Sequence, residues 1–138
     1  MEGKDFLELA KKFQNSGIEA ERRTSVSRAY YAIFNHVKSS LNNLRIKLPE
    51  AAHAHEKMYQ YLFNSGLEEA EDLAEELNNL RKRRNDADYE LISPKFNHDK
   101  RNCGLICVKA MLFFDQFNKI NPSNLEKGIL EYKRKTNN

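Results

Sequence analysis

The sequence predicts an all-α fold, an antiparallel bundle of four to five main helices followed by a short C-terminal helix. Apolar residues recur at steps of three and four over long stretches, which is the spacing of one helix face. Only five glycines and three prolines interrupt 138 residues, which favours long helices over a strand-rich fold. The length fits one domain, and we expect residues 1–138 to form it, with a short basic tail at about 122–138.

The first two expected helices open the bundle. The first covers about 5–15 and ends before Gly17, a common type of helix stop. The second covers about 19–44, and its apolar stripe runs from Val26 to Leu44. At ~1.5 Å per residue this helix spans roughly 40 Å, long enough to be the spine of a bundle.

Three further helices are expected after the break at Pro49. The Ser-Gly pair at 65–66 separates the first two of them, and a loop around Pro94 separates the last two. The segment NPSN at 121–124 then ends the last one and caps the short basic tail helix. In chain order the three helices cover about 52–64, 67–86 and 97–120.

Composition and charge limit the classes of function. The chain is 40% hydrophobic and 31% charged, which is typical of globular domains. Its formal net charge is only +3, so binding of nucleic acid must come from clustered charge. We expect neither a membrane span nor a secretory signal, because no apolar run reaches ~18 residues and the start MEGKDFLELAKKF is charged. Two cysteines form no disulfide framework, so we expect a cytoplasmic protein.

The stretch RKRRNDADY at 81–89 concentrates positive charge at the end of a helix. Bases near a helix C-terminus complement the dipole, which accounts for Lys82 and Arg83. Arg84 differs, because it continues the inward-facing leucine row of its helix. One alternative is an ion pair between the Arg84 guanidinium and a carboxylate, for which Asp88, one helical turn further on, is the candidate. The other is that Arg84 faces a concave site, where its planar guanidinium suits a phosphate. The residues alone leave both alternatives open.

A polar arc accompanies the apolar stripe of the second expected helix. The segment TSVSRAYYAIFNH places Ser27, Arg28 and Tyr31 on this arc, whereas Tyr30 lies with the core. The arc is either an ordinary solvated helix face or one wall of a cleft near Arg84.

Two sequence segments, separated by some fifty residues, resemble paired motifs of one protein family. They are SRAYYAIFNH at 27–36 and LRKRRNDADY at 80–89, and together they resemble the HEPN family of small helical domains. HEKMYQYLFNSGL at 55–67 is similar to the histidine-led third helix of that family, and the resemblance covers roughly 4–120. It implies a helical bundle, usually a homodimer, in prokaryotic toxin–antitoxin or antiviral defence systems. It also implies RNA or a nucleotide as ligand, and a small nucleotidyltransferase as antitoxin partner.

The resemblance also assigns roles to residues. Many such domains are metal-independent endoribonucleases, so we expect neither a metal nor a cofactor. The expected catalytic residues are Arg84 on the scissile phosphate, Asn85 orienting it, and Tyr89 at the position of the motif histidine. The expected nucleic-acid-binding residues are Arg81, Arg83 and Arg28, and the expected cleft-lining residues are Ser27, Tyr31 and Asp88.

The motif of these ribonucleases, an arginine and a histidine separated by four to six residues, is incomplete here. With four residues between, Tyr89 follows Arg84 in place of the histidine, and a tyrosine with an ordinary pKa of ~10 is a poor base at pH 7. In a second alignment Tyr89 matches a tyrosine that the partner enzyme modifies, Ala87 replaces the histidine and Lys82 takes the arginine position. The alternative hypothesis is a non-catalytic nucleotide-binding or regulatory module beside a nucleotidyltransferase. A third is an assembly subunit in which Arg84 and Asp88 form only a structural pair.

Other reactive residues are expected to be structural. Cys103 and Cys107 share a helix face, and we expect buried core thiols rather than a zinc site. His53 and His55 stand at the start of the third helix, where we expect a surface turn rather than a metal-binding pair. His98 opens a helix near Pro94, and we expect it to have a local structural role. The alternative is a relocated base, because a short loop joins its helix to the arginine motif.

The fifth expected helix is apolar over a wider arc than one bundle face needs. Phe113, Phe114 and Phe117 either join the core or help form a subunit interface. The sequence leaves both alternatives open.

Overall fold

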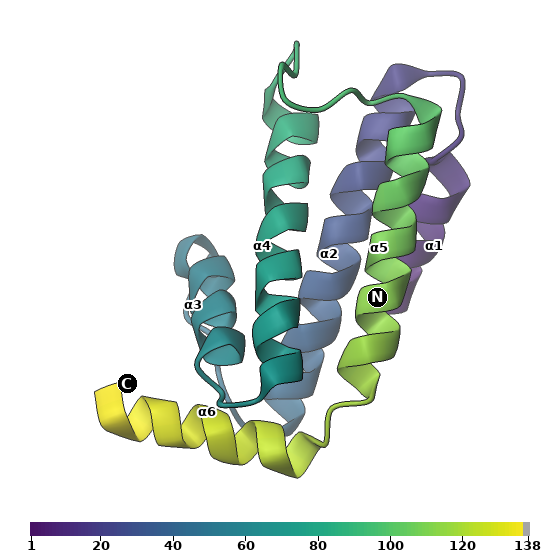
Figure 1. The fold of residues 1–138 in the computed structure, drawn as a ribbon. Helices are drawn as coiled ribbons and strands as arrows, with labels where there is room; N and C mark the ends of the chain where they lie inside the picture. The colour runs from purple at the N-terminus through teal and green to yellow at the C-terminus, as the bar shows by residue number, and fades with distance from the viewer. Residues whose placement is uncertain (137–138) are drawn as a thin grey trace.

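The computed structural model describes residues 1–136, and all regular structure within them is helical (Figure 1). The predicted all-α class is therefore confirmed. Within this described part, no helix is long and apolar enough to cross a membrane. The helices are α1 (Gly3–Phe13), α2 (Glu19–Asn43), α3 (Ala51–Phe63), α4 (Glu68–Tyr89), α5 (Lys100–Asn118) and α6 (Pro122–Thr136).

Four helices form the bundle, and α2 is its centre. α2 packs against α1, α4 and α5, and these four helices alternate in direction along the chain (Figure 1). Val26, Ile33 and Leu41 of α2 are fully buried, because the predicted stripe meets neighbours on more than one side. The shorter α3 lies against α4, and α6 crosses one end of the bundle (Figure 1).

A left-handed residue ends α2 and turns the chain toward α3. Arg45 has a φ of 61°, and the amide of Ile46 donates to the carbonyl of Leu41 at 2.9 Å. This is the long hydrogen bond of a Schellman motif, which here accompanies a fully buried Ile46. A non-glycine residue in this conformation costs about 1–2 kcal/mol. The burial of Ile46 offsets that cost and fixes where the segment before α3 lies.

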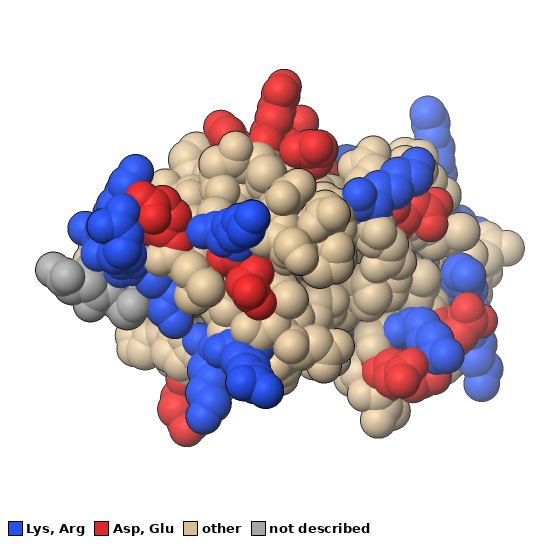
Figure 2. All heavy atoms as spheres, turned by 90° about the horizontal axis from the view of Figure 1, so that it is seen from below, with Lys and Arg blue, Asp and Glu red and all other residues tan. Residues whose placement is uncertain are grey.

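α6 is anchored to the bundle. Ile129 is fully buried, and a Cβ at Gly128 would stand 1.8 Å from the carbonyl oxygen of Ser65, so only glycine allows this approach. Acidic and basic side chains are interspersed over this end of the molecule, and basic ones gather toward the C-terminal end of α6 (Figure 2). The predicted basic tail at about 122–138 therefore contains a docked helix, and its residues 137–138 lie outside the described part.

α4 runs to Tyr89 and so extends beyond the predicted end at about residue 86. The helical pattern persists to the last turn, where the amide of Glu90 donates to the carbonyl of Asp86 at 3.2 Å. The extension matters for the site, because it keeps Tyr89 on the same helix as Arg84, a little more than one turn away.

α5 buries only part of its apolar arc. Phe113 and Phe117 belong to the core, and Phe114 is partly buried against it. Of the two alternatives open from the sequence, core or subunit interface, Phe113 and Phe117 therefore take the first. A strip of apolar side chains remains on the outer face, and its members are Leu105, Val108, Met111 and Leu112.

Candidate functional site

Arg84 lies on the inward face of α4, as its place in the leucine row predicts. Leu80 and Ala87 on the same face are buried, and Arg84 itself is 7% exposed. Burial removes the guanidinium from water, which is unfavourable unless other groups stabilise the charge. The neighbours of Arg84 therefore decide what it can do.

Three tyrosine rings surround the Arg84 guanidinium. Its central carbon lies 5.5 Å from the ring centre of Tyr30, 5.3 Å from that of Tyr31 and 5.9 Å from that of Tyr89. Its Nη1 also donates to the Tyr89 hydroxyl at 3.4 Å. Such cation–π contacts contribute about 0.5–2 kcal/mol each, and they leave the hydrogen-bonding capacity of the cation largely unused. The Nε of Arg84 is buried and has no acceptor.

The ion pair between Arg84 and Asp88, one of the two alternatives open from the sequence, does not form. Asp88 instead accepts a hydrogen bond from the Ser27 hydroxyl at 3.1 Å, which ties α2 to the end of α4. The ion pairs within residues 1–136 do not include Arg84. A structural pair therefore does not account for the buried charge.

Arg28 and Arg81 join Arg84 in what we call the unpaired arginine cluster. Arg28 lies over the rings of Phe6 and Tyr31, at 5.5 Å and 5.2 Å from their centres. The Nε atoms of Arg28 and Arg81 are buried without an acceptor, like that of Arg84. None of the three has a carboxylate partner in the described part of the chain. Three cations without counter-charge favour the binding of an anion.

His55 belongs to this site, although its sequence position predicts a surface turn. Its ring is half-buried and stacks on Phe34 at 4.3 Å between ring centres. Its Nδ1 is 2.5 Å from the hydroxyl of Tyr30, whose ring lies under the Arg84 guanidinium. The one sign of this in the sequence is the resemblance of the third helix, which begins with a histidine in related domains.

The protonation of the His55–Tyr30 pair follows from its surroundings. Burial, reinforced by the charges of Arg81 and Arg84, lowers the pKa of His55 to about 4. Burial raises the pKa of Tyr30, so its hydroxyl stays protonated at neutral pH. That hydroxyl is buried and has no other acceptor, so we assign its proton to the bond with Nδ1. The neutral His55 ring then carries its own proton on Nε2.

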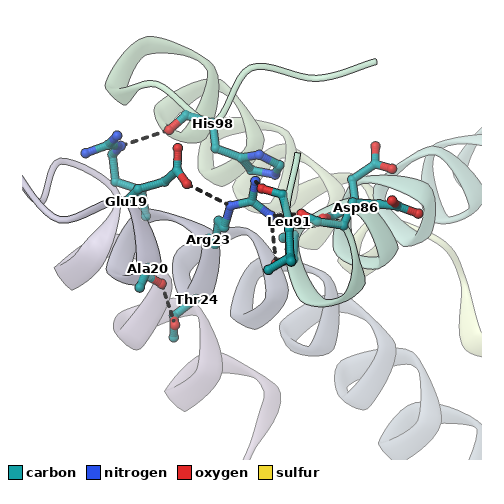
Figure 3. Close-up of polar contacts among 10 residues, drawn as sticks. Glu19, Ala20, Arg23, Thr24, Asp86, Leu91 and His98 are labelled. Atoms are coloured by element: carbon teal, nitrogen blue, oxygen red, sulfur yellow. Dashed lines mark hydrogen bonds and ion pairs between the residues drawn. The ribbon is translucent and has the colours of Figure 1, made fainter. Parts of the chain in front are cut away.

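A second group, which we call the loop-anchoring arginines, consists of Arg22, Arg23 and Arg83. Arg23 points into the turn after α4 and pairs with Glu19 at 3.4 Å (Figure 3). Its Nη atoms donate to a series of backbone carbonyls, so the side chain acts as a cap for the end of α4. The acceptors are the carbonyls of Asp86, Ala87, Glu90 and Leu91.

Arg83 and Arg22 hold the rest of the same loop. Arg83 donates to the Asp86 carboxylate at 3.2 Å and to the carbonyl of Lys95 at 3.4 Å. Arg22 donates to the carbonyl of His98 at 2.8 Å. Arg83 was expected to contact nucleic acid, but its donors serve the loop between α4 and α5.

His98 does not join the Arg84 site, although the short loop made it a candidate base. It is 3% exposed, both ring nitrogens are buried without a partner, and its ring packs on Phe96 at 4.9 Å. Burial lowers its pKa, with a further contribution from Arg23. The residue therefore lies among the loop-anchoring arginines rather than beside Tyr31.

The remaining expected site residues range from exposed to buried. Asn85 and Asp88 are exposed, and Tyr89 is 71% exposed at the end of α4. Ser27 is buried beneath Asp88, and Tyr31 is partly buried between Arg28 and Arg84. The structure thus brings the expected cleft residues of α2 and α4 together.

The described residues contain no cluster of side chains suited to binding a metal ion. No group of three or more His, Cys, Asp and Glu side chains in residues 1–136 could hold an ion. Cys103 and Cys107 are buried free thiols, and burial raises the pKa of Cys103 to about 11. A thiol with such a pKa is a poor metal ligand and a poor nucleophile at neutral pH.

Comparison with known proteins identifies one family to which the chain is similar. The family model described as HEPN domain matches residues 2–120. Curated proteins and solved structures yield no match. The matched span contains α1 to α5 with every residue of the candidate site, and it ends before α6.

Proposed function

The chain belongs to the HEPN domain family, and on that premise we propose that it acts on RNA through the unpaired arginine cluster. Membership supports a nucleotide- or RNA-related role in a general sense. The finer proposal is a metal-independent endoribonuclease of a toxin–antitoxin or antiviral defence system. It would work in the cytoplasm as a homodimer, with a small nucleotidyltransferase as its antitoxin partner.

One observation carries the proposal: the buried guanidinium of Arg84 has aromatic neighbours but no carboxylate. Arg28 and Arg81 likewise have no carboxylate partner in residues 1–136, so the cluster holds three buried Nε donors without acceptors. A phosphate group would supply oxygen acceptors and a counter-charge together, and the planar arginine fork matches two phosphate oxygens. An RNA strand offers such groups along its whole backbone.

The chemistry would be transesterification at the scissile phosphate. The 2′-oxygen bonds to phosphorus, the bond to the 5′-oxygen breaks, and the attacking hydroxyl loses a proton while the leaving oxygen gains one. Arg84 and Arg81 would stabilise the charge that develops on the phosphorane. Asn85, exposed beside Arg84, would orient the phosphate.

Tyr89 would take the position of the motif histidine. Its hydroxyl lies 3.4 Å from Nη1 of Arg84, and the ring is 71% exposed, so a substrate can reach it. His55 is not a base in the protonation state assigned above, because its Nε2 carries the proton. The catalytic proposal therefore depends on Tyr89 or a water molecule accepting the 2′-proton.

A second candidate function is a regulatory module controlled by a nucleotidyltransferase. The exposed Tyr89 hydroxyl favours it, because a partner enzyme can reach this group without unfolding the chain. Transfer of a nucleotidyl group from a nucleoside triphosphate to that oxygen would release pyrophosphate. The product would carry a phosphate next to Arg84 and occupy the cluster itself.

The catalytic proposal is tested by incubating the purified protein with end-labelled single-stranded RNA, with and without a chelator. We expect cleavage that the chelator does not change and products that end in a 2′,3′-cyclic phosphate. Arg84→Lys keeps the charge and loses the fork, and should slow cleavage at least tenfold. Arg83→Lys, the matched control one residue away, should stay within about twofold, because a loop-anchoring residue lies outside the cluster.

Absence of cleavage of any RNA by the folded protein would remove the catalytic version. The regulatory version is tested separately, by incubation with a nucleotidyltransferase and ATP followed by mass spectrometry. A mass increase of one nucleotidyl group that Tyr89→Phe abolishes would support it. A mass increase that persists in Tyr89→Phe would contradict it.

A further inference from the structure

A hollow next to the unpaired arginine cluster is not used by the chemistry described so far. It has a volume of about 650 Å³ and opens between α2 and the start of α3. This size lies within the range of about 300–1,000 Å³ that is typical of small-molecule sites. Its walls are Tyr31, Phe34, Lys38, Leu48, Pro49, Glu50, Ala51, Ala54 and His55.

Two of the lining side chains connect the hollow to the cluster. Tyr31 borders the hollow, and its ring also lies 5.3 Å from the Arg84 guanidinium carbon. His55 borders the hollow and is joined through Tyr30 to the other side of Arg84. A ligand that fills the hollow therefore lies beside any phosphate held by the cluster.

We propose that the hollow binds an unpaired base of single-stranded RNA, whose neighbouring phosphate lies on the unpaired arginine cluster. The inference rests on the phosphate site proposed above and names a second contact with the same strand. A base flanked by a phosphate is the ligand that fits both parts, because it combines a flat apolar body with one adjacent negative charge.

The lining matches the chemistry of a base. Aromatic side chains bind bases in single-stranded nucleic acids largely through stacking, which tolerates several sequences. Here Tyr31, Phe34 and His55 supply aromatic rings, and Leu48 with Pro49 supplies apolar surface. A protein helix or a lipid chain would leave the adjacent cations without a counter-charge.

Polar groups at the rim can contact the edge of the base. His55 Nε2 has no hydrogen-bond partner in residues 1–136 and is not among the buried unpaired atoms, so it is open to a ligand. In the assigned protonation state it donates. Lys38 is a second donor, and Glu50 is an acceptor on the same rim. Donors and an acceptor on one rim allow the hollow to prefer some bases over others.

The proposal is tested by NMR titration of the full-length protein with the four common ribonucleoside 5′-monophosphates, with adenosine, and with ribose 5-phosphate. The His55 ring resonances report the hollow, and the Arg84 Nε–H resonance reports the cluster. His55→Gln assigns the first set among the four histidines. At least one nucleotide should shift both resonances, ribose 5-phosphate should shift only Arg84, and adenosine should shift only His55.

A binding measurement with the same ligands provides the second arm. Lys38 is exposed, so Lys38→Ala should leave the fold unchanged and lower the binding affinity for the preferred nucleotide about tenfold. Its effect on ribose 5-phosphate should be less than about twofold. Lys47→Ala is the matched control, because this exposed lysine precedes Leu48 and does not line the hollow.

The outcomes separate the two proposals. If nucleotides shift Arg84 and leave His55 unchanged, the base site is overturned while the phosphate site stands. If no nucleotide and no sugar phosphate shifts either resonance, the phosphate site falls and the base site falls with it.

Discussion

The molecule uses two groups of three arginines, both drawn from α2 and α4, in opposite ways. The loop-anchoring arginines direct their donors to backbone carbonyls and to two carboxylates, those of Glu19 and Asp86. In the unpaired arginine cluster, Arg28 and Arg84 lie over aromatic rings. The buried Nε atoms of all three members have no acceptor. Every member of the first group donates to a backbone carbonyl, and Arg23 Nε, which lacks a hydrogen bond, still lies 3.4 Å from the Glu19 carboxylate. No member of the second group has a carboxylate partner in residues 1–136, so the proposed anion would supply one.

Adjacent residues of one helix therefore have different roles although their side chains are chemically identical. Arg83 and Arg84 are adjacent in α4, but the roughly 100° turn per residue directs one to the loop and the other into the bundle. A basic stretch alone does not indicate a nucleic-acid site. The partners of each guanidinium do, and each of the following predictions tests that distinction.

The largest effect is expected on RNA cleavage. Arg84→Ala should reduce the rate by about 100- to 1,000-fold, because it removes a preorganised cation from the developing phosphorane charge. Arg83→Ala should change the rate by less than about threefold. Single-turnover cleavage rates measure both. Equal losses of cleavage rate in the two variants would contradict the separation of the arginines into a cluster that acts on RNA and a group that anchors the loop.

The next effect is on stability. Arg23→Ala should lower the free energy of unfolding by about 2–3 kcal/mol, because the carbonyls at the end of α4 lose a charged donor. Arg28→Ala should cost less than about 1–2 kcal/mol, since it removes two ring contacts and one long hydrogen bond, from Nη2 of Arg28 to the Ser27 hydroxyl at 3.3 Å. Urea unfolding measures both values. A larger loss for Arg28→Ala than for Arg23→Ala would contradict the assignment.

A smaller effect is expected on the salt dependence of RNA binding. Each phosphate contact on a single strand contributes about 0.7 to the slope of log affinity against log salt concentration. Arg81→Ala should reduce the slope by about that amount, whereas Arg22→Ala should leave it unchanged. Fluorescence anisotropy with a nuclease-resistant RNA between 50 and 200 mM salt, as rough limits, provides the measurement. An unchanged slope in Arg81→Ala would remove this residue from the phosphate site.

The smallest effect concerns pH and the charge of the cluster. The pKa of His55 is about 4 in the fold and 6.5 in the unfolded chain, so between these values the unfolded state binds more protons. Stability is therefore fully present above pH 6.5 and declines as the pH falls toward about 4. We expect His55 to contribute about 1 kcal/mol of this decline, since its ring is partly solvated.

His55→Gln isolates this contribution. The variant keeps a neutral hydrogen-bond acceptor for the Tyr30 hydroxyl and removes the titrating ring. Unfolding free energies at pH 7 and pH 4.5, as approximate endpoints on either side of most of the transition, should differ less in the variant than in the wild type. His98, whose pKa is also lowered, is present in both proteins and cancels from the comparison. An identical pH dependence would show that burial and the arginine charges do not lower the pKa of His55.

The parts of the site that follow helical periodicity could be predicted from the sequence. Counting along the leucine row placed Arg84 inside the bundle. The resemblance placed Tyr31 and Ser27 in one cleft with it, and in the structure Tyr31 contacts Arg84 while Ser27 binds Asp88. The role of Arg83 could not be predicted, because it depends on a loop whose path follows no period. His55 was missed for a similar reason: its partner Tyr30 lies on another helix, and only tertiary packing joins them.

The fold shows the same division between local and tertiary causes. Apolar spacing predicted the helices of the bundle, because each stripe needs a buried partner. The extension of α4 to Tyr89 required Arg23 from another helix as its cap, which no local pattern indicates. The docking of α6 depends on the close approach at Gly128, a contact with Ser65 that is distant in sequence.

The central claim is that the cluster of Arg28, Arg81 and Arg84 is the phosphate site and the loop-anchoring group is not. The most direct test is a titration of the arginine Nε–H resonances with a short, nuclease-resistant single-stranded RNA. The three Nε–H resonances of the cluster should shift in proportion to bound RNA, while those of Arg22, Arg23 and Arg83 stay in place. Shifts confined to the loop-anchoring group, or equal in both groups, would contradict the account.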